Sequence, residues 1–377
     1  MPINEIDYMI FSQLVYNNFD GIAVTSEHIS LSSAAEEFFT NYSDADVDAL
    51  IDVAQRAGHM LKACKDTERF GSAVINNYIN NVDGSLDKQI SAMSFLLDDG
   101  SILVSFRGTD ASVAGFKESA MLTYMFPIPA QIEALHYFQE TAMLHDGAVR
   151  LCGHSKGGNL AVFAAVNCSN SLQKKIDGIY SFDAPGFPEW FFERHDYQQI
   201  ENKLNIYNPH NSLVGRALCM KKEPNIVIST AKHGRQHNVA TWIIDDAAFR
   251  RADAYTADSD KLSGYFNNLI SEISDKEFEV FYDALEQTAN QMGVSDFYDL
   301  KEVDTNMLSI IVDSIQTLNP EQKKRFNSIA RNLLAFVAKE YVSGAVTKTK
   351  KAVKTISGKI PFVGKNKDSA EQKEPEA

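Results

Sequence analysis

The apolar positions of this chain follow a helical period at the start, and strand-like runs appear later. Residues 1 to about 75 predict mainly helices, because apolar residues recur at helical spacing in "DYMIFSQLVYNNF" and again after Ser43, a candidate N-cap. Two short apolar runs follow in "ISAMSFLLDDGSILVSFRGTD". The pair Asp99-Gly100 between these runs predicts a β-hairpin.

From residue 130 onward, helical and strand-like segments alternate. Helices are predicted at 130–145, 158–168, 188–200 and 212–220, and strands at 147–153, 178–186, 203–209 and 225–230. This alternation is typical of a mostly parallel sheet with helices on both faces. We therefore predict an α/β domain over residues 1–255, with a helical N-terminal segment.

Strand signals stop beyond about residue 255. Ser274 and Glu277 have capping-box spacing, and Asn319 with Pro320 marks a second helix start. These signals predict a helical appendage over 256–344. The tail over 345–377 contains seven lysines and no acid in "TKTKKAVKTISGKIPFVGKNK" and then an acid-rich end, which predicts disorder.

Composition narrows the class of protein. Hydrophobic residues make up 44% of the 377 residues, enough for a sizeable core. The net charge of −14 argues against a nucleic-acid partner, because like charges repel. The four cysteines, Cys64, Cys152, Cys168 and Cys219, form no C-x-x-C pair, so neither a disulfide framework nor a zinc site is indicated.

The same features favour a cytoplasmic protein. The first residues lack a basic region followed by an uninterrupted apolar run, and no window reaches 18 apolar residues. The Lys-rich tail leaves an alternative open: peripheral contact with the anionic inner face of a membrane. The other interpretation of the tail is a solvated charged segment.

A candidate catalytic serine lies in "LCGHSKGGNLAVFAA". In this stretch Gly153 and Gly157 flank Ser155 between a predicted strand and a predicted helix. This spacing is typical of a nucleophile elbow, a sharp turn that exposes the serine hydroxyl at the end of a strand. Open α/β sheets place their ligand sites at that edge. A serine nucleophile also needs a base, an orienting acid and donors for the oxyanion.

His237 is the preferred base because it follows the last predicted strand by a short loop. His233 is its nearest competitor, and His210 and His195 are less well placed. The expected chain order, serine, acid, histidine, favours Asp183 at the end of the strand after the nucleophile helix. The alternative for Asp183 is a residue that caps its own turn.

The oxyanion donors are expected to be backbone N–H groups of Lys156, which follows the nucleophile, and of Thr109 in "VSFRGTD". The Thr109 hydroxyl is a further candidate donor. Gly108 permits close approach of this loop. We expect the Lys156 side chain to point to solvent; the alternative is that its ammonium attracts an anionic group.

Taken together, "VSFRGTD", "GHSKGGNLA" and "YSFDAPGF" resemble the class 3 (fungal-type) lipases of the α/β-hydrolase superfamily, and also a related bacterial family of unknown function. The resemblance spans about residues 1–245. It implies Ser155 as nucleophile, Thr109 in the oxyanion loop and His237 as base. The chain differs from class 3 lipases at the position of their catalytic carboxylate. The corresponding stretch "PHNSLVGRAL" offers only Asn211 or Ser212, neither of which has a carboxylate. Pancreatic-type lipases place the acid one strand earlier, at the position of Asp183.

Class 3 lipases carry a lid after the oxyanion loop, where this chain has "ESAMLTYMFPIPAQ". Two prolines there predict a loop. An apolar patch in this segment suits an acyl chain, although core packing is an equally good interpretation. The patch consists of Met121, Leu122, Tyr124, Met125 and Phe126.

The prediction is a serine hydrolase of carboxylic esters, with an acylglycerol-like or lysophospholipid-like substrate and an acyl-enzyme intermediate. This chemistry requires no metal or cofactor. Two alternatives remain: a catalytically inactive hydrolase fold used for binding or as a scaffold, and a thioesterase or short-chain esterase.

Overall fold

The computed structural model describes residues 3–22, 28–50, 52–83, 88–110, 113–272 and 274–291, together with 314, 318–321 and 323. The chain divides into two compact units, Met1–Asp299 and Leu300–Ala377. The boundary predicted after residue 255 lies inside the first unit. The predicted tail over 345–377 lies outside the described residues.

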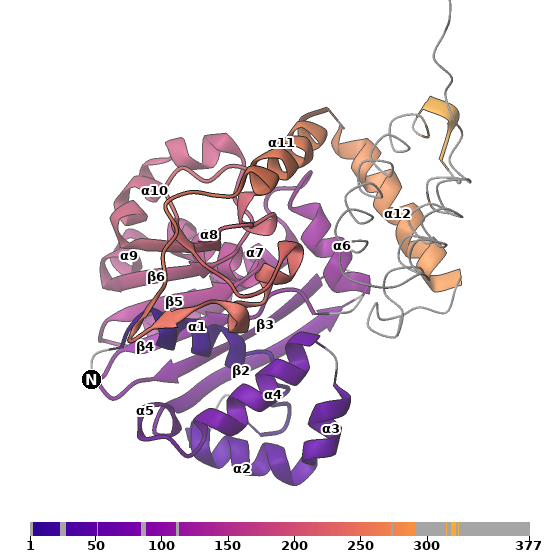
Figure 1. The fold of residues 1–377 in the computed structure, drawn as a ribbon. Helices are drawn as coiled ribbons and strands as arrows, with labels where there is room; N and C mark the ends of the chain where they lie inside the picture. Colours follow the sequence, from indigo (N-terminus) through magenta and orange to yellow (C-terminus); the bar gives the residue numbers. More distant parts are fainter. Residues whose placement is uncertain are drawn as a thin grey trace, which may run out of the picture. The chain divides into compact units, whose positions relative to one another are not determined.

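A single large sheet organises the first unit (Figure 1), and in its described part eight strands follow one another in chain order. Neighbours pair antiparallel from β1 to β4 and parallel from β4 to β8. The strands are β1 (Ile29–Ser30), β2 (Val74–Asp83), β3 (Lys88–Leu96), β4 (Ile102–Phe106), β5 (Val149–His154), β6 (Ile176–Phe182), β7 (Leu204–Pro209) and β8 (Asn225–Val227). The predicted α/β-hydrolase-type, mostly parallel sheet is confirmed.

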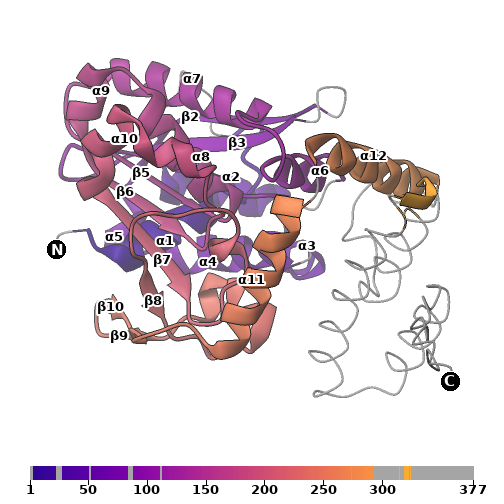
Figure 2. The same ribbon diagram turned by 90° about the horizontal axis from the view of Figure 1, so that it is seen from above.

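Helices cover both faces of this sheet, as Figure 2 shows. One face packs against α7 (Pro129–Met143), α8 (Lys156–Asn167) and α10 (His195–Ile200). The other packs against α1 (Glu5–Leu14), α2 (Leu31–Asn41) and α4 (Asp52–Cys64). Because successive strand residues point to opposite faces, Val104 of β4 is buried in the first core and Leu103 in the second.

Local signals in the sequence placed many of these elements correctly. Ser43 caps α3 (Asp44–Ala49) in a capping box, and Ser274 caps α12 (Asp275–Gln291) through hydrogen bonds with Glu277. In the second unit the Glu321 N–H donates to Asn319 Oδ1 at 3.1 Å, as expected of a cap before Pro320. The short remaining helices are α5 (Glu68–Gly71) and α9 (Asn170–Lys175).

Three expectations about elements were wrong. Strand β2 was not predicted, because its asparagine-rich sequence has low β propensity and a bulge near Asn77 interrupts the alternation. The helix predicted at 212–220 is only a 3₁₀ turn at Val214–Arg216. Residues 118–121, predicted as loop, end the helix α6 (Val113–Met121).

Two described helices, α11 (Ala257–Glu272) and α12, occupy the start of the predicted appendage. Helix α12 lies beside α6 in both views (Figures 1 and 2). Tyr124, just after α6, stacks with Phe278 and Tyr282, and Lys117 pairs with Asp283 at 3.1 Å. A two-stranded ribbon, β9 (Ile244–Asp245) with β10 (Ala248–Phe249), completes the unit. None of the helices in the described ranges is long and apolar enough to span a bilayer.

Candidate active site

Ser155 stands between β5 and α8, at the carboxyl end of a parallel strand. Its backbone has φ 57° and ψ −134°, a strained conformation for a residue with a side chain. Glycines on either side make this turn possible: a Cβ on Gly153 would lie 2.6 Å from the Gly158 nitrogen, and one on Gly157 would lie 2.8 Å from the Arg107 carbonyl carbon. Ser155 is therefore held on a sharp strand-to-helix turn.

His237 and Asp183 meet although 54 positions separate them in the chain. The His237 Nδ1 lies 2.7 Å from Asp183 Oδ2, and the Asp183 side chain is 1% exposed. Because an ionised carboxylate only accepts hydrogen bonds, Nδ1 carries the proton and Nε2 of a neutral ring is left as the acceptor. This is the tautomer that a general base requires.

Asp183 is itself held by the loop after β7. The Ser212 hydroxyl donates to Asp183 Oδ1 at 2.5 Å, and the Gly215 N–H donates to the same oxygen at 3.1 Å. Ser212 is one of the two residues, with Asn211, that the sequence offers where the resemblance to class 3 lipases leads one to expect the acid. In this chain that position therefore supports a carboxylate supplied by the preceding strand.

His154, the residue that precedes Ser155, contacts His237. The rings of His154 and His237 have centroids 4.5 Å apart, and His154 Nε2 lies 2.9 Å from the His237 carbonyl oxygen. Within the described ranges no hydrogen bond joins the Ser155 hydroxyl to the His237 ring. Hydrogen bonds of this kind are often long without substrate and shorten when a substrate binds.

The loop after β4 lies directly against the serine. A Cβ on Gly108 would be 3.1 Å from the Ser155 Cβ and 2.6 Å from the His154 carbonyl oxygen. The N–H groups of Thr109 and Lys156 find no acceptor among the residues that the structure describes. The Thr109 hydroxyl, by contrast, hydrogen-bonds to the Ser119 hydroxyl, which in turn donates to the Gly115 carbonyl.

The Lys156 side chain is buried, not solvent-exposed as expected. Its Nζ donates to Glu118 Oε2 at 2.7 Å and to the Gln89 carbonyl and side-chain oxygens at 2.7 and 2.8 Å. The Lys156 and Glu118 side chains are 1% and 0% exposed. Burial lowers the pKa of the Lys156 ammonium, and the Glu118 carboxylate opposes this shift. The first residue of α8 thus points its side chain into the core of the unit.

The apolar segment after the oxyanion loop is divided between core and surface. Met121 and Leu122 are buried in the core, which agrees with the packing interpretation. Phe126 makes edge-on contacts with Phe163 and Trp190, and Tyr124 stacks against α12. Met125 is 39% exposed.

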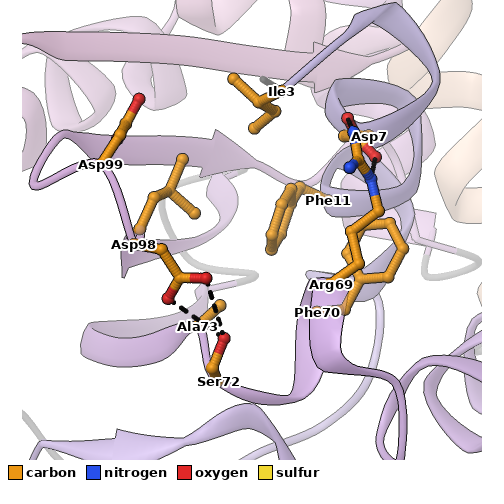
Figure 3. A pocket seen from close by; sticks show the side chains of 10 residues that line it. Ile3, Asp7, Phe11, Arg69, Phe70, Ser72, Ala73, Asp98 and Asp99 are labelled. Atoms are coloured by element: carbon orange, nitrogen blue, oxygen red, sulfur yellow. Dashed lines mark hydrogen bonds and ion pairs between the residues drawn. The ribbon is translucent and has the colours of Figure 1, made fainter. Parts of the chain in front are cut away.

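Two pockets in the described part of the chain lie away from Ser155, because neither is lined by the residues around it. The larger, about 370 Å³, lies between the start of α1, α5 and the turn before β4 (Figure 3). That turn is at the opposite end of the parallel strands from Ser155. Asp7 and Arg69 form an ion pair in its wall. The smaller pocket, about 230 Å³, is lined by His195 and Lys203 among others.

The competing histidines occupy other places. His210 Nδ1 lies 3.3 Å from the Val227 carbonyl, and His195 begins α10 beside the smaller pocket. His233 opens the 3₁₀ helix that ends at His237, and its side chain lies outside the described part. No cluster of three or more His, Cys, Asp or Glu side chains suited to a metal ion occurs in the portion of the chain that the structure describes.

Sequence reasoning missed two groups next to the site, Tyr16 and the Glu118–Gln89 pair. The Tyr16 hydroxyl accepts a hydrogen bond from the Gly108 N–H at 3.0 Å and lies 3.2 Å from His154 Nδ1. Tyr16 follows α1, more than 90 residues before the oxyanion loop. No local pattern could have indicated its place at the site.

Comparison with known proteins finds lipases among solved structures. The crystal structure of M37 lipase has 14% identity and a TM-score of 0.37, covering 71% of this chain and 81% of that chain. A deletion mutant of Rhizomucor miehei lipase in a propeptide complex has 14% identity and a TM-score of 0.35, covering 59% and 67%. The native form of that complex has 15% identity and a TM-score of 0.32, covering 54% and 73%.

A search of curated protein sequences found no match. A family model, in contrast, covers the oxyanion loop, the serine turn, Asp183 and His237. This model, described as Mbeg1-like, matches residues 64–287, more than half of the chain, and the protein therefore belongs to the Mbeg1-like family.

Proposed function

We propose that the protein is a serine hydrolase that cleaves carboxylic esters through an acyl-enzyme. The observation that carries the proposal is the 2.7 Å contact between His237 Nδ1 and the buried Asp183 carboxylate, beside a serine on a strained turn. A histidine oriented in this way can accept a proton at Nε2. The strained backbone of Ser155 also favours a functional role, because such strain gathers at active sites.

The proposed reaction begins when Ser155 Oγ attacks the ester carbonyl while His237 Nε2 takes the hydroxyl proton. The oxyanion accepts hydrogen bonds from the N–H groups of Thr109 and Lys156. The intermediate then collapses, the C–O bond to the alcohol breaks, and His237 returns its proton to the leaving oxygen. Water attacks the acyl-enzyme by the same path, with His237 as base, and releases the carboxylic acid.

The proposed ester substrate carries a lipid-like acyl group. It is supported by apolar side chains that remain accessible near the segment after α6: Met125 is 39% exposed and Trp190 is 51% exposed. Trp190 also contacts Phe126, with ring centroids 5.1 Å apart. Ester substrates with long acyl chains should therefore be cleaved faster than acetate esters.

A fluorophosphonate probe tests the hydrolase itself. Intact-mass measurement should show one adduct on the wild-type chain and none on Ser155→Ala. Ser171→Ala is a matched control, because Ser171 is an exposed serine on α9, outside the site. It should label like wild type. If wild type does not react with the probe while a known serine hydrolase does, the enzyme proposal is refuted. The protein would then be a catalytically inactive hydrolase fold used as a scaffold.

A series of p-nitrophenyl esters of increasing acyl length tests the substrate class. Faster turnover with eight or more carbons would support the lipid-like assignment. Activity confined to acetate and propionate would instead favour a short-chain esterase.

A further inference from the structure

Tyr16 brings a hydroxyl from the N-terminal segment into the candidate site. It follows α1 in a turn in which its own N–H donates to the Gln13 carbonyl at 3.0 Å. Tyr16 is 7% exposed, so its hydroxyl interacts in surroundings where hydrogen bonds are stronger than in water. Helix α1 packs across β5, the strand that leads to Ser155, and this packing carries Tyr16 to the carboxyl edge of the sheet.

The first contact of this hydroxyl is with the oxyanion loop. The Gly108 N–H donates to Tyr16 Oη at 3.0 Å, so the tyrosine holds the peptide group that precedes Thr109. The next amide along the chain, the Thr109 N–H, has no acceptor within the described ranges. One amide of the loop is therefore held by Tyr16, and the following one makes no hydrogen bond to a residue that the structure describes.

The second contact is with His154, and its direction can be deduced. A carbonyl oxygen only accepts hydrogen bonds, so the 2.9 Å contact with the His237 carbonyl requires a proton on His154 Nε2. Burial lowers the pKa of His154 well below its usual range, so the ring is neutral and Nδ1 is bare. The hydroxyl of Tyr16, 3.2 Å away, must then donate to Nδ1.

We propose that Tyr16 is a positioning residue of the hydrolytic site, whose hydroxyl ties the oxyanion loop to His154 and, through His154, to the backbone of His237. The chain of donors runs from Gly108 N–H to Tyr16 Oη to His154 Nδ1, and from His154 Nε2–H to the His237 carbonyl. The inference rests on the proposed function, because it assigns Tyr16 to holding the groups that would bind the oxyanion and move the proton. Oxyanion donors are effective only when they are held in place before reaction.

The test replaces Tyr16 with phenylalanine, which keeps the ring and removes the hydroxyl. Tyr137→Phe is the matched control, because it removes another buried hydroxyl, that of Tyr137 on helix α7, which donates to the Asn77 carbonyl of β2. In Tyr16→Phe, kcat for a p-nitrophenyl ester should fall about 10- to 100-fold, less than the loss of an oxyanion donor itself, with KM within about twofold. Tyr137→Phe should keep kcat within about twofold. An active wild type with unchanged kcat in Tyr16→Phe would overturn the assignment.

A second readout is independent of activity. NMR of the wild-type protein should show a bare Nδ1 and a protonated Nε2 on His154. In Tyr16→Phe, exchange of the Gly108 amide hydrogen should accelerate at least about 10-fold, and the His154 Nδ1 signal should shift. Neither should change in Tyr137→Phe. Unchanged signals in Tyr16→Phe would overturn the bridge even if wild type is inactive. An inactive wild type in which these signals do change would refute the hydrolytic role and the proposed function while the bridge stands.

Discussion

The buried pair between Lys156 and Glu118 allows a quantitative test of how the serine turn is anchored. Glu118 Oε2 accepts hydrogen bonds from Lys156 Nζ at 2.7 Å and from the Gln89 N–H at 3.0 Å, while Oε1 accepts from the Ala130 N–H at 2.8 Å. A glutamine at position 118 has one acceptor oxygen in place of two. In Glu118→Gln, at least one of these buried donors must therefore face an NH₂ group.

The expected loss of stability follows from the Lys156 charge that stays buried after the substitution. Removal of one partner of a buried pair costs about 3–5 kcal/mol, because the other charge is left uncompensated. Lys156 can also lose its proton. Each pH unit is worth about 1.4 kcal/mol, so keeping a lysine of ordinary pKa neutral costs about 4.6 kcal/mol at pH 7 and about 1.9 kcal/mol at pH 9. We expect Glu118→Gln to lose about 3–5 kcal/mol at pH 7.

The pH dependence has a definite sign. Without Glu118 the folded-state pKa of Lys156 falls further below its unfolded value, so the unfolded chain binds more protons than the folded one. The free energy of unfolding of Glu118→Gln should therefore rise with pH between 7 and 9, by up to about 1.4 kcal/mol per unit relative to wild type.

Urea unfolding followed by circular dichroism at pH 7, 8 and 9 measures this difference. Adding Lys156→Met to Glu118→Gln provides the control, because the double variant buries no charge and should regain most of the lost stability. A loss below about 1 kcal/mol in Glu118→Gln, or a loss that does not change with pH, would refute the reasoning.

Three further predictions concern the groups around the serine. Ser212→Ala removes a donor to Asp183 but leaves the Gly215 N–H, so ester hydrolysis should fall about 10-fold, measured as kcat; unchanged kcat would mean that Ser212 does not orient the acid. Gly108→Ala should abolish fluorophosphonate labelling, because its Cβ would lie 2.6 Å from a backbone oxygen; wild-type labelling would contradict the close packing of this loop. His154 has a lowered folded pKa, caused by burial and by the nearby His237 and Arg56, so the unfolded chain takes up a proton first as pH falls below about 6.5. Wild type should therefore lose stability from pH 7 to 5 more steeply than His154→Phe in urea unfolding, and parallel curves would refute this.

Much of the candidate site could be predicted because its parts are encoded locally. Gly153 and Gly157 allow the backbone to pack closely around Ser155, which itself has a positive φ. The turn can therefore be recognised in a short stretch of sequence. The caps at Ser43 and Ser274 are equally local. The pairing of Asp183 with His237 is not local, but chain order and the shared edge of parallel strands restrict the candidates to few residues. The roles of these residues in a reaction stay predictions.

Tertiary packing alone decided the rest. Lys156 was expected in solvent because lysine usually is, yet Glu118 from another helix compensates its burial. Tyr16 reaches Gly108 only because α1 crosses the sheet, and Ser212 serves Asp183 only because β6 and β7 are neighbours. By itself the sequence determined the local backbone, since short-range steric effects set each turn and cap. The tertiary structure determined which distant polar groups share the interior, since a buried donor or charge is stable only beside a partner that the fold supplies.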